Sequence, residues 1–201
     1  MNHYKLHEGL NVLPFYIEIH NEENSSNWTG ARHPIHKETT TVEIYRKDEG
    51  ELEEIRSAKG YAKELGTTKR VMEFNTYPYT EKFLSWFIET YGGIIGKARY
   101  IGLPAKGNVP LHADRGYVGR PYGPGRNYGE ATYYEEYPDR FHFVVCGKYQ
   151  YTVNEEMQEY VSGDLWWFSN KFPHSAYNHG DIERISLIFD VKNCNWRDSI
   201  V

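Results

Sequence analysis

The sequence predicts a mainly β protein, built as a sandwich or barrel and supported by an N-terminal part of mixed helix and strand. From residue 94 onward, short apolar runs alternate with Gly, Pro and Asn, which is typical of antiparallel folds with tight turns. Aromatic residues make up 16% of the chain, led by 18 Tyr, and they favour strands. Because 201 residues suffice for one core, we expect a single domain over 1–201, with the support in 1–93 and the β core in 94–192.

Within the N-terminal support, the clearest signal is a helix over residues 79–93. Phe83, Phe87 and Tyr91 recur every four residues, Thr80 is the expected N-cap, and two glycines end the pattern. The weaker predictions in this part are strand-like runs at 12–19 and 39–47, a polar loop at 20–38 and a short polar helix at 49–66.

Composition excludes several classes of protein. A net charge of −5 provides no electrostatic footprint for nucleic acid. No apolar run is long enough for a membrane span, and the first ten residues lack the apolar core of a signal peptide. Cys146 and Cys194 have no metal-binding spacing and indicate a reducing compartment, so we expect a cytoplasmic protein.

The stretch FPHSAYNHGDIERISLIFD, residues 172–190, combines apolar runs with two polar residues. It places His174 at the end of one run and Arg184 at the start of the next, with a turn signal between them. We therefore expect a β-hairpin. A histidine and an arginine facing a core cost free energy unless they are satisfied, and a metal and an acid would satisfy them.

Metal ligands can come in pairs from one strand, because residues i and i+2 point the same way. Four His-x-Asp or His-x-Glu pairs occur: His20/Glu22, His36/Glu38, His112/Asp114 and His179/Asp181. An iron site of two histidines and one carboxylate also needs a second histidine, which should come from a later strand.

The pair His112/Asp114 fits this requirement best. No histidine follows His179, and the thirteen residues between Glu22 and His36 cannot hold the intervening strands. His174 follows His112 by 62 positions across the strand-rich region, and Arg184 comes ten later.

Three segments carry a resemblance to a known family: RYIGLPAKGNVPLHAD, DRFHFVV and SGDLWWFSNKFPHSAYNHGDIERISLIFDV. They resemble the aspartyl/asparaginyl β-hydroxylase family of Fe(II)- and 2-oxoglutarate-dependent dioxygenases, in particular its bacterial members, which include free-proline hydroxylases. The resemblance covers residues 94–192. It implies a double-stranded β-helix, a cupin-like jelly roll, that uses Fe(II) and 2-oxoglutarate.

The resemblance also implies roles for individual residues. The implied iron ligands are His112, Asp114 and His174. Arg184 would bind the distal carboxylate of 2-oxoglutarate, and Arg140 and His142 would help to hold this co-substrate. Alternation in RFHF places Arg140 and His142 on one face of their strand, with Phe141 and Phe143 on the other.

The implied reaction is hydroxylation of an amino acid, either free or as an Asp/Asn-type residue in a peptide. It would consume O₂ and release succinate and CO₂. Two positions depart from the vertebrate membrane-bound members of the family. Asp114 stands where they keep a glycine, and Ile101 falls near a serine that contacts 2-oxoglutarate in them.

A Gly- and Tyr-rich insertion at residues 115–139 separates His112 from Arg140. Because both its ends lie next to expected site residues, we expect a lid over the metal. Its side chains could bind a carboxylate substrate through Arg115, Arg120, Arg126, Tyr117 and Tyr122. An idle insertion is the alternative.

Plainer interpretations remain for each residue. His174 could be a hydrogen-bonded core histidine, and Arg140 and Arg184 could be salt-bridge partners. We expect Trp166 and Trp167 in the core, and we expect four histidines at the surface: His20, His33, His36 and His179. For the whole chain, the alternative is a metal-binding cupin-like isomerase or sensor without oxygenase turnover. Arg184 favours the oxygenase, because a cupin isomerase needs no carboxylate clamp.

Overall fold

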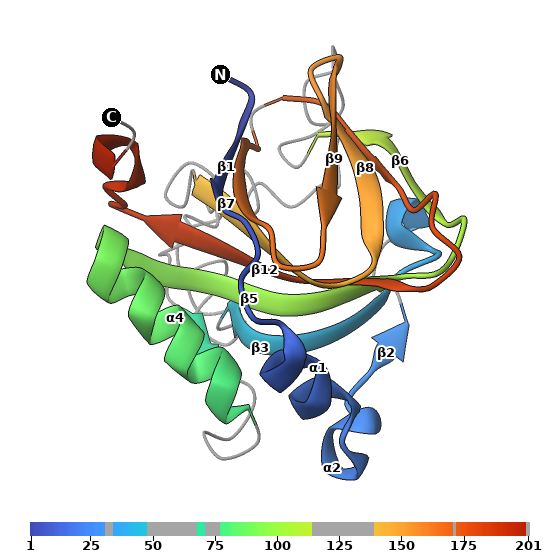
Figure 1. Cartoon of the computed structure of the whole chain (residues 1–201), viewed down its shortest axis with the longest axis horizontal. Coiled ribbons are helices and arrows are strands. Elements are labelled where there is room, and N and C mark those ends of the chain that lie inside the picture. The colour runs from blue at the N-terminus through green and yellow to red at the C-terminus, as the bar shows by residue number, and fades with distance from the viewer. Residues whose placement is uncertain (31–33, 48–67, 71–76, 114–138, 171, 200–201) are drawn as a thin grey trace, which may run out of the picture.

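Two antiparallel sheets face each other in the computed structural model, and they form a double-stranded β-helix (Figure 1). The structure describes residues 1–30, 34–47, 68–70, 77–113, 139–170 and 172–199. The prediction of a mainly β, jelly-roll fold is confirmed. The helix expected at 49–66 and all but the last residue of the insertion at 115–139 lie outside the described residues.

The large sheet has eight strands within the described residues, in the order β1-β10-β7-β12-β5-β3-β2 with β4 beside β3. Its strands are β1 (His3–His7), β2 (Thr29–Gly30), β3 (Thr40–Lys47), β4 (Thr68–Arg70), β5 (Ile94–Leu103), β7 (Asp139–Cys146), β10 (Leu165–Ser169) and β12 (Arg184–Lys192). N-terminal and C-terminal segments therefore share one sheet.

The small sheet has the order β6-β11-β8-β9. Its strands are β6 (Asn108–His112), β8 (Lys148–Val153), β9 (Glu156–Val161) and β11 (His174–Tyr177). Apolar side chains of both sheets meet in an inner core that includes Val144, Tyr151 and the fully buried Trp166.

The outer face of the large sheet is covered by α1 (Leu13–His20) and α4 (Pro78–Tyr91), which lie on the side away from the small sheet (Figure 1). Three short elements complete the described chain: α2 (Glu22–Ser25), η1 (Pro34–His36) and η2 (Trp196–Ser199). Within the described residues, no helix is long and apolar enough to span a membrane.

The strand expected at residues 12–19 is wrong, because this run forms α1. Pro14 occupies the first turn, where its missing N–H costs no hydrogen bond. The buried residues are Phe15, Glu18 and Ile19, which have the i, i+3, i+4 spacing of a helix face rather than strand alternation.

The helix predicted at 79–93 is confirmed as α4, and Phe83, Phe87 and Tyr91 are buried on one face. Gly92, with φ of 70°, follows its last residue. Thr80 is not the N-cap, however: Tyr77 holds that position. The backbone N–H groups of Tyr79 and Thr80 donate instead to the buried Glu18 carboxylate of α1, which satisfies the start of the helix.

The β-hairpin expected at 172–190 is also wrong, because β11 belongs to the small sheet and β12 to the large one. The fully buried Asn178 holds the crossing between them. Its side-chain amide donates to the carbonyls of Leu103, Pro104 and Ile182, and its oxygen accepts from the N–H of Gly180. His174 and Arg184 therefore lie on facing sheets rather than on paired strands.

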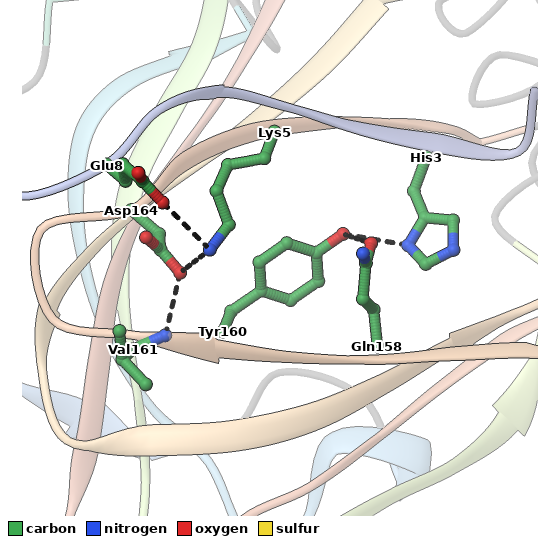
Figure 2. A network of polar contacts seen from close by, with 7 residues as sticks. All are labelled: His3, Lys5, Glu8, Gln158, Tyr160, Val161 and Asp164. Atoms are coloured by element: carbon green, nitrogen blue, oxygen red, sulfur yellow. Dashed lines mark hydrogen bonds and ion pairs between the residues drawn. The ribbon is translucent and has the colours of Figure 1, made fainter.

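A polar network joins β1, the edge strand of the large sheet, to β9 of the small sheet and to Asp164, just before β10 (Figure 2). Lys5 Nζ lies 2.9 Å from Oδ2 of the buried Asp164, which also accepts a hydrogen bond from the N–H of Val161. Nδ1 of His3 lies 2.7 Å from the hydroxyl of Tyr160. We call these residues, together with Glu8, Glu156 and Gln158, the β1 network.

Candidate active site

A pocket lies between the two sheets and is lined by side chains from both. The large sheet contributes Arg140 and His142 from β7, Arg184 and Ile188 from β12, and Arg99 and Ile101 from β5. The small sheet contributes Val109 and His112 from β6, Tyr151 from β8, and His174 and Ala176 from β11. His36 of η1 completes the lining.

His112 and His174 are directly opposed on paired strands of the small sheet. Their ring centroids are 4.4 Å apart and their planes meet at 61°. His174 is 2% exposed and packs against Phe168 and Tyr151, whereas His112 is half-buried. The structure thus brings together two predicted ligands that are 62 positions apart in the sequence.

Both rings are oriented by the same local hydrogen bond. Nδ1 of His112 donates to the carbonyl of Pro110 at 2.8 Å, and Nδ1 of His174 donates to the carbonyl of Phe172 at 2.9 Å. A neutral imidazole that donates through Nδ1 carries its lone pair on Nε2. This is how metal-binding histidines are commonly held, so the pair fits a metal such as Fe(II).

A complete ligand set is not visible in the part of the chain that the structure describes, where no group of three or more His, Cys, Asp or Glu could hold a metal ion. The predicted third ligand, Asp114, lies one residue beyond Ala113, the last described residue of that segment. Its role stays a prediction. So do the substrate roles of Arg115, Tyr117, Arg120, Tyr122 and Arg126, which also lie outside the described residues.

Arg184 is buried in this pocket and is 2% exposed. Its guanidinium lies 4.3 Å from the ring centroid of Tyr149 and donates one long hydrogen bond, 3.4 Å, to the carbonyl of Ile101. Its Nε has no hydrogen-bond partner, and no carboxylate of the described residues pairs with it. Burial lowers the pKa of Arg184, but an arginine stays protonated.

The second buried arginine, Arg140, is paired within the chain. Its Nε and Nη2 donate to the two carboxylate oxygens of Asp190 at 2.6 and 3.1 Å, and both residues are buried. This bidentate ion pair neutralises Arg140 and fixes its orientation. Arg140 lines the pocket as predicted, and the co-substrate role implied for it stays a prediction.

His142 is 2% exposed and lies on the same face of β7 as Arg140, whereas Phe141 and Phe143 pack in the outer core. The alternation predicted for RFHF is therefore confirmed. Burial lowers the pKa of His142 well below its ordinary value, and the positive charges of Arg184 and Arg140 lower it further. His142 is thus a neutral hydrogen-bonding group, and its Nδ1 lies 3.2 Å from the hydroxyl of Tyr149.

Three pocket features were not predicted from the sequence. His36, expected at the surface, lies in the pocket wall with its ring centroid 4.9 Å from that of His112. Arg99 lines the pocket from β5. Tyr149 contacts both Arg184 and His142. A signal for Arg99 exists in the sequence, since Ala98 and Tyr100 on either side are apolar and alternation turns Arg99 to the opposite face.

The fold and the pocket place the chain among cupin-type jelly-roll proteins. The family model for aspartyl/asparaginyl β-hydroxylase matches residues 72–194, which is more than half of the chain. The chain belongs to this family, as the resemblance of its motifs indicated. The match begins 22 residues before the segment that carried the resemblance and includes α4.

Solved structures with a similar fold include a 2-oxoglutarate-Fe(II) oxygenase family oxidoreductase from Burkholderia pseudomallei, which is 11% identical with a TM-score of 0.49. The match covers 83% of this chain and 73% of that one. A predicted oxalate decarboxylase from Thermotoga maritima is 15% identical with a TM-score of 0.35, over 49% of this chain and 67% of that one. The cupin domain of Schizosaccharomyces pombe Cnp3 is 11% identical with a TM-score of 0.36, over 51% and 64%. No curated protein matches the chain in sequence.

Proposed function

We propose that this protein is an Fe(II)- and 2-oxoglutarate-dependent dioxygenase that hydroxylates an amino acid, either free or as an Asp/Asn-type residue in a peptide. His112 and His174 would hold the metal together with Asp114. Bound Fe(II) would supply the activation of O₂, coupled to oxidative decarboxylation of 2-oxoglutarate to succinate and CO₂. Membership of the hydroxylase family supports this assignment.

The observation that carries the proposal is the buried, unpaired guanidinium of Arg184. An isolated buried charge costs several kcal/mol, and proteins retain such a charge where a partner compensates for it. No carboxylate of the described residues forms an ion pair with Arg184, although the charge of Glu183 acts on it, and this supports a ligand carboxylate as its partner. A guanidinium with a free Nε matches a carboxylate through two charge-assisted hydrogen bonds, and 2-oxoglutarate has a carboxylate at each end.

The surrounding residues prepare this interaction. Tyr149 supports Arg184 through its ring face and reaches His142 through its hydroxyl. The neutral His142 can hydrogen-bond an anion without adding charge, while Arg140 is neutralised by Asp190. Trp166, Phe168 and Val144 exclude water from this end of the pocket, which strengthens electrostatic attraction there. These contacts support Arg184 as a strong, fixed site for a carboxylate.

The proposed function is tested by measuring product formation by the purified protein. Fe(II), 2-oxoglutarate and O₂ are supplied with a panel of free amino acids and of Asp-, Asn- and Pro-containing peptides. We expect succinate, together with a product heavier by one oxygen atom. His112→Ala and His174→Ala should abolish both products while the protein stays folded by circular dichroism. His20→Ala, at an exposed position outside the pocket, is the matched control.

Metal binding without turnover is the second candidate function, and it rests on the histidine pair alone. If the protein binds one metal per chain through His112 and His174 but forms no succinate with any panel member, the oxygenase assignment is wrong. Unchanged metal binding in both histidine variants would remove both candidates.

A further inference from the structure

The pocket has a closed end and an open end, and each end contains charged side chains. Four polar residues at the closed end are between 2% and 5% exposed: Arg140, His142, His174 and Arg184. Arg99, Ile101, His112 and His36 are only half-buried and form the open side. A co-substrate held by Arg184 lies at the closed end, so a second molecule that approaches the metal meets the residues of the open side.

Among the described residues that line the open side, Arg99 is the one arginine. It lies on β5 between Ala98 and Tyr100, both fully buried in the outer core, and alternation turns its side chain into the pocket beside Ile101. In strand register, His142 of β7 pairs with Ile188 of β12, and Ile188 pairs with Arg99 of β5. Arg99 therefore belongs to the same face of the sheet as His142, two strands away.

Within the described residues, Arg99 also has no ion-pair partner. No carboxylate of the described residues pairs with it, and it forms no ion pair with Glu43, the residue directly opposite on β3. Asp190 is already engaged by Arg140. The described pocket thus presents two guanidinium groups without a counter-charge, Arg184 at the closed end and Arg99 at the open end. One co-substrate accounts for the first of them.

We propose that Arg99 is a second anion-binding residue of the pocket and holds a carboxylate of the substrate. The inference rests on the proposed oxygenase function and adds to it a recognition element within the barrel wall. It defines the substrate class as one that presents a carboxylate close to the carbon that is oxidised, as a free amino acid or an acidic side chain does. A planar guanidinium discriminates such a group from its neutral amide, which lacks the charge and one acceptor oxygen.

Matched pairs of probes test this inference: L-amino acids against their carboxamides, and Asp peptides against the same peptides with Asn. Calorimetry measures their affinity for protein loaded with Ni(II) and 2-oxoglutarate, so binding is read without turnover. We expect the wild type to prefer the carboxylate by about tenfold or more, since hydrogen bonds to a charged group contribute about 1.5–3 kcal/mol. Arg99→Gln should remove this preference, and Arg99→Lys should retain part of it. Glu43→Gln, which changes the opposite residue on β3, is the matched control and should keep it.

The outcomes separate this inference from the function on which it rests. An Arg99→Gln variant that keeps the full preference overturns the role of Arg99, even if the wild type forms succinate. If the preference for carboxylate over amide depends on Arg99 but the protein forms no succinate, the anion site is supported and the oxygenase assignment is wrong. If the wild type does not distinguish carboxylate from amide in any pair, the inference is wrong.

Discussion

The β1 network and the pocket both contain buried charged groups, but these are paired in the β1 network, whereas Arg184 of the pocket has no ion-pair partner among the described residues. In the β1 network, the buried carboxylate of Asp164 lies 2.9 Å from Lys5 (Figure 2). His3 lies 3.6 Å from Glu156. In the pocket, Arg184 is buried just as deeply and meets no carboxylate of the described residues.

This difference separates two uses of a polar side chain. A charge that is paired within the chain stabilises the chain, and in the β1 network the pair joins the edge strand β1 to Asp164, just before β10. A buried charge that is left unpaired destabilises the ligand-free fold and is available to a ligand. The comparison therefore predicts that substitutions in the two regions have opposite effects on stability.

The largest expected effect comes from Arg184→Met, which removes the unpaired charge and keeps much of the side-chain volume. We expect the free energy of unfolding of the ligand-free protein to stay equal or rise, by up to about 4 kcal/mol, because a buried uncompensated charge is lost. The KM for 2-oxoglutarate should rise by about 10–150-fold as the carboxylate loses its charged donors. Urea unfolding and succinate formation measure the two effects.

Arg140→Met is the matched control for this experiment, because it removes a paired arginine of the same pocket and takes the bidentate guanidinium away from the buried Asp190 carboxylate. We expect it to destabilise the fold by about 3–5 kcal/mol. A comparable loss of stability in Arg184→Met would contradict the comparison, since it would mean that Arg184 is compensated within the chain.

A smaller effect is expected from Asp164→Ala in the β1 network. The variant leaves Lys5 and the N–H of Val161 without their acceptor, so unfolding should become easier by about 1–3 kcal/mol. The exposed Glu8, whose carboxylate is 4.0 Å from Lys5, is the control, and Glu8→Ala should change stability by less than about 0.5 kcal/mol. Equal effects of the two variants would show that burial of Asp164 does not matter.

Tyr149→Phe removes one hydroxyl from the pocket and keeps the ring beneath Arg184. Burial raises the pKa of Tyr149 to about 12, so this hydroxyl is neutral and acts by hydrogen bonding, with His142 at 3.2 Å. Losing a hydrogen bond of about 1 kcal/mol should raise the KM for 2-oxoglutarate about fivefold with little change in kcat. Tyr149→Leu removes the ring as well and should raise this KM further. An equal effect of both variants would place the whole contribution of Tyr149 in its hydroxyl.

Local patterns were sufficient to predict much of the fold and part of the site. Alternation located β7 and the faces of Arg140 and His142, and the four-residue recurrence of aromatics located α4. The spacing of His112 and His174 across the strand-rich region indicated that they meet, which the pairing of β6 with β11 confirms. These predictions succeeded because each depends on periodicity within one element or on the order of elements.

The features that were missed depend on distant partners. The turn chemistry around Asn178 indicated a hairpin, but its side-chain amide bonds to Leu103 and Pro104, about 75 positions earlier, and these bonds direct the chain into the other sheet. Arg99 begins the segment RYIGLPAKGNVPLHAD and His36 belongs to the pair His36/Glu38, but neither pattern assigned them to the site. Strand register and the packing of η1 bring them to the pocket. α1 is a short apolar run, for which periodicity distinguishes helix from strand poorly.

The smallest expected effect concerns the pH dependence of the β1 network. Burial lowers the pKa of His3, and the negative charge of Glu156 offsets this in part. The folded protein therefore binds a proton at His3 less readily than the unfolded chain, whose histidine has a pKa of about 6.5. The contribution of neutral His3 to stability is fully present above about pH 6.5, and it declines as the pH falls from there toward the pKa of the folded state.

Two variants shift this decline in opposite directions. His3→Gln removes the titrating group, so the free energy of unfolding should fall less steeply between about pH 6.5 and pH 5 than in the wild type. Glu156→Gln removes the charge that favours protonated His3, which lowers its pKa in the folded state further and should make the fall steeper. Urea unfolding at a series of pH values measures both slopes. If Glu156→Gln made the fall shallower, the charge of Glu156 would not stabilise protonated His3. The polar groups of the β1 network would then not compensate one another, and the contrast with the pocket would fail.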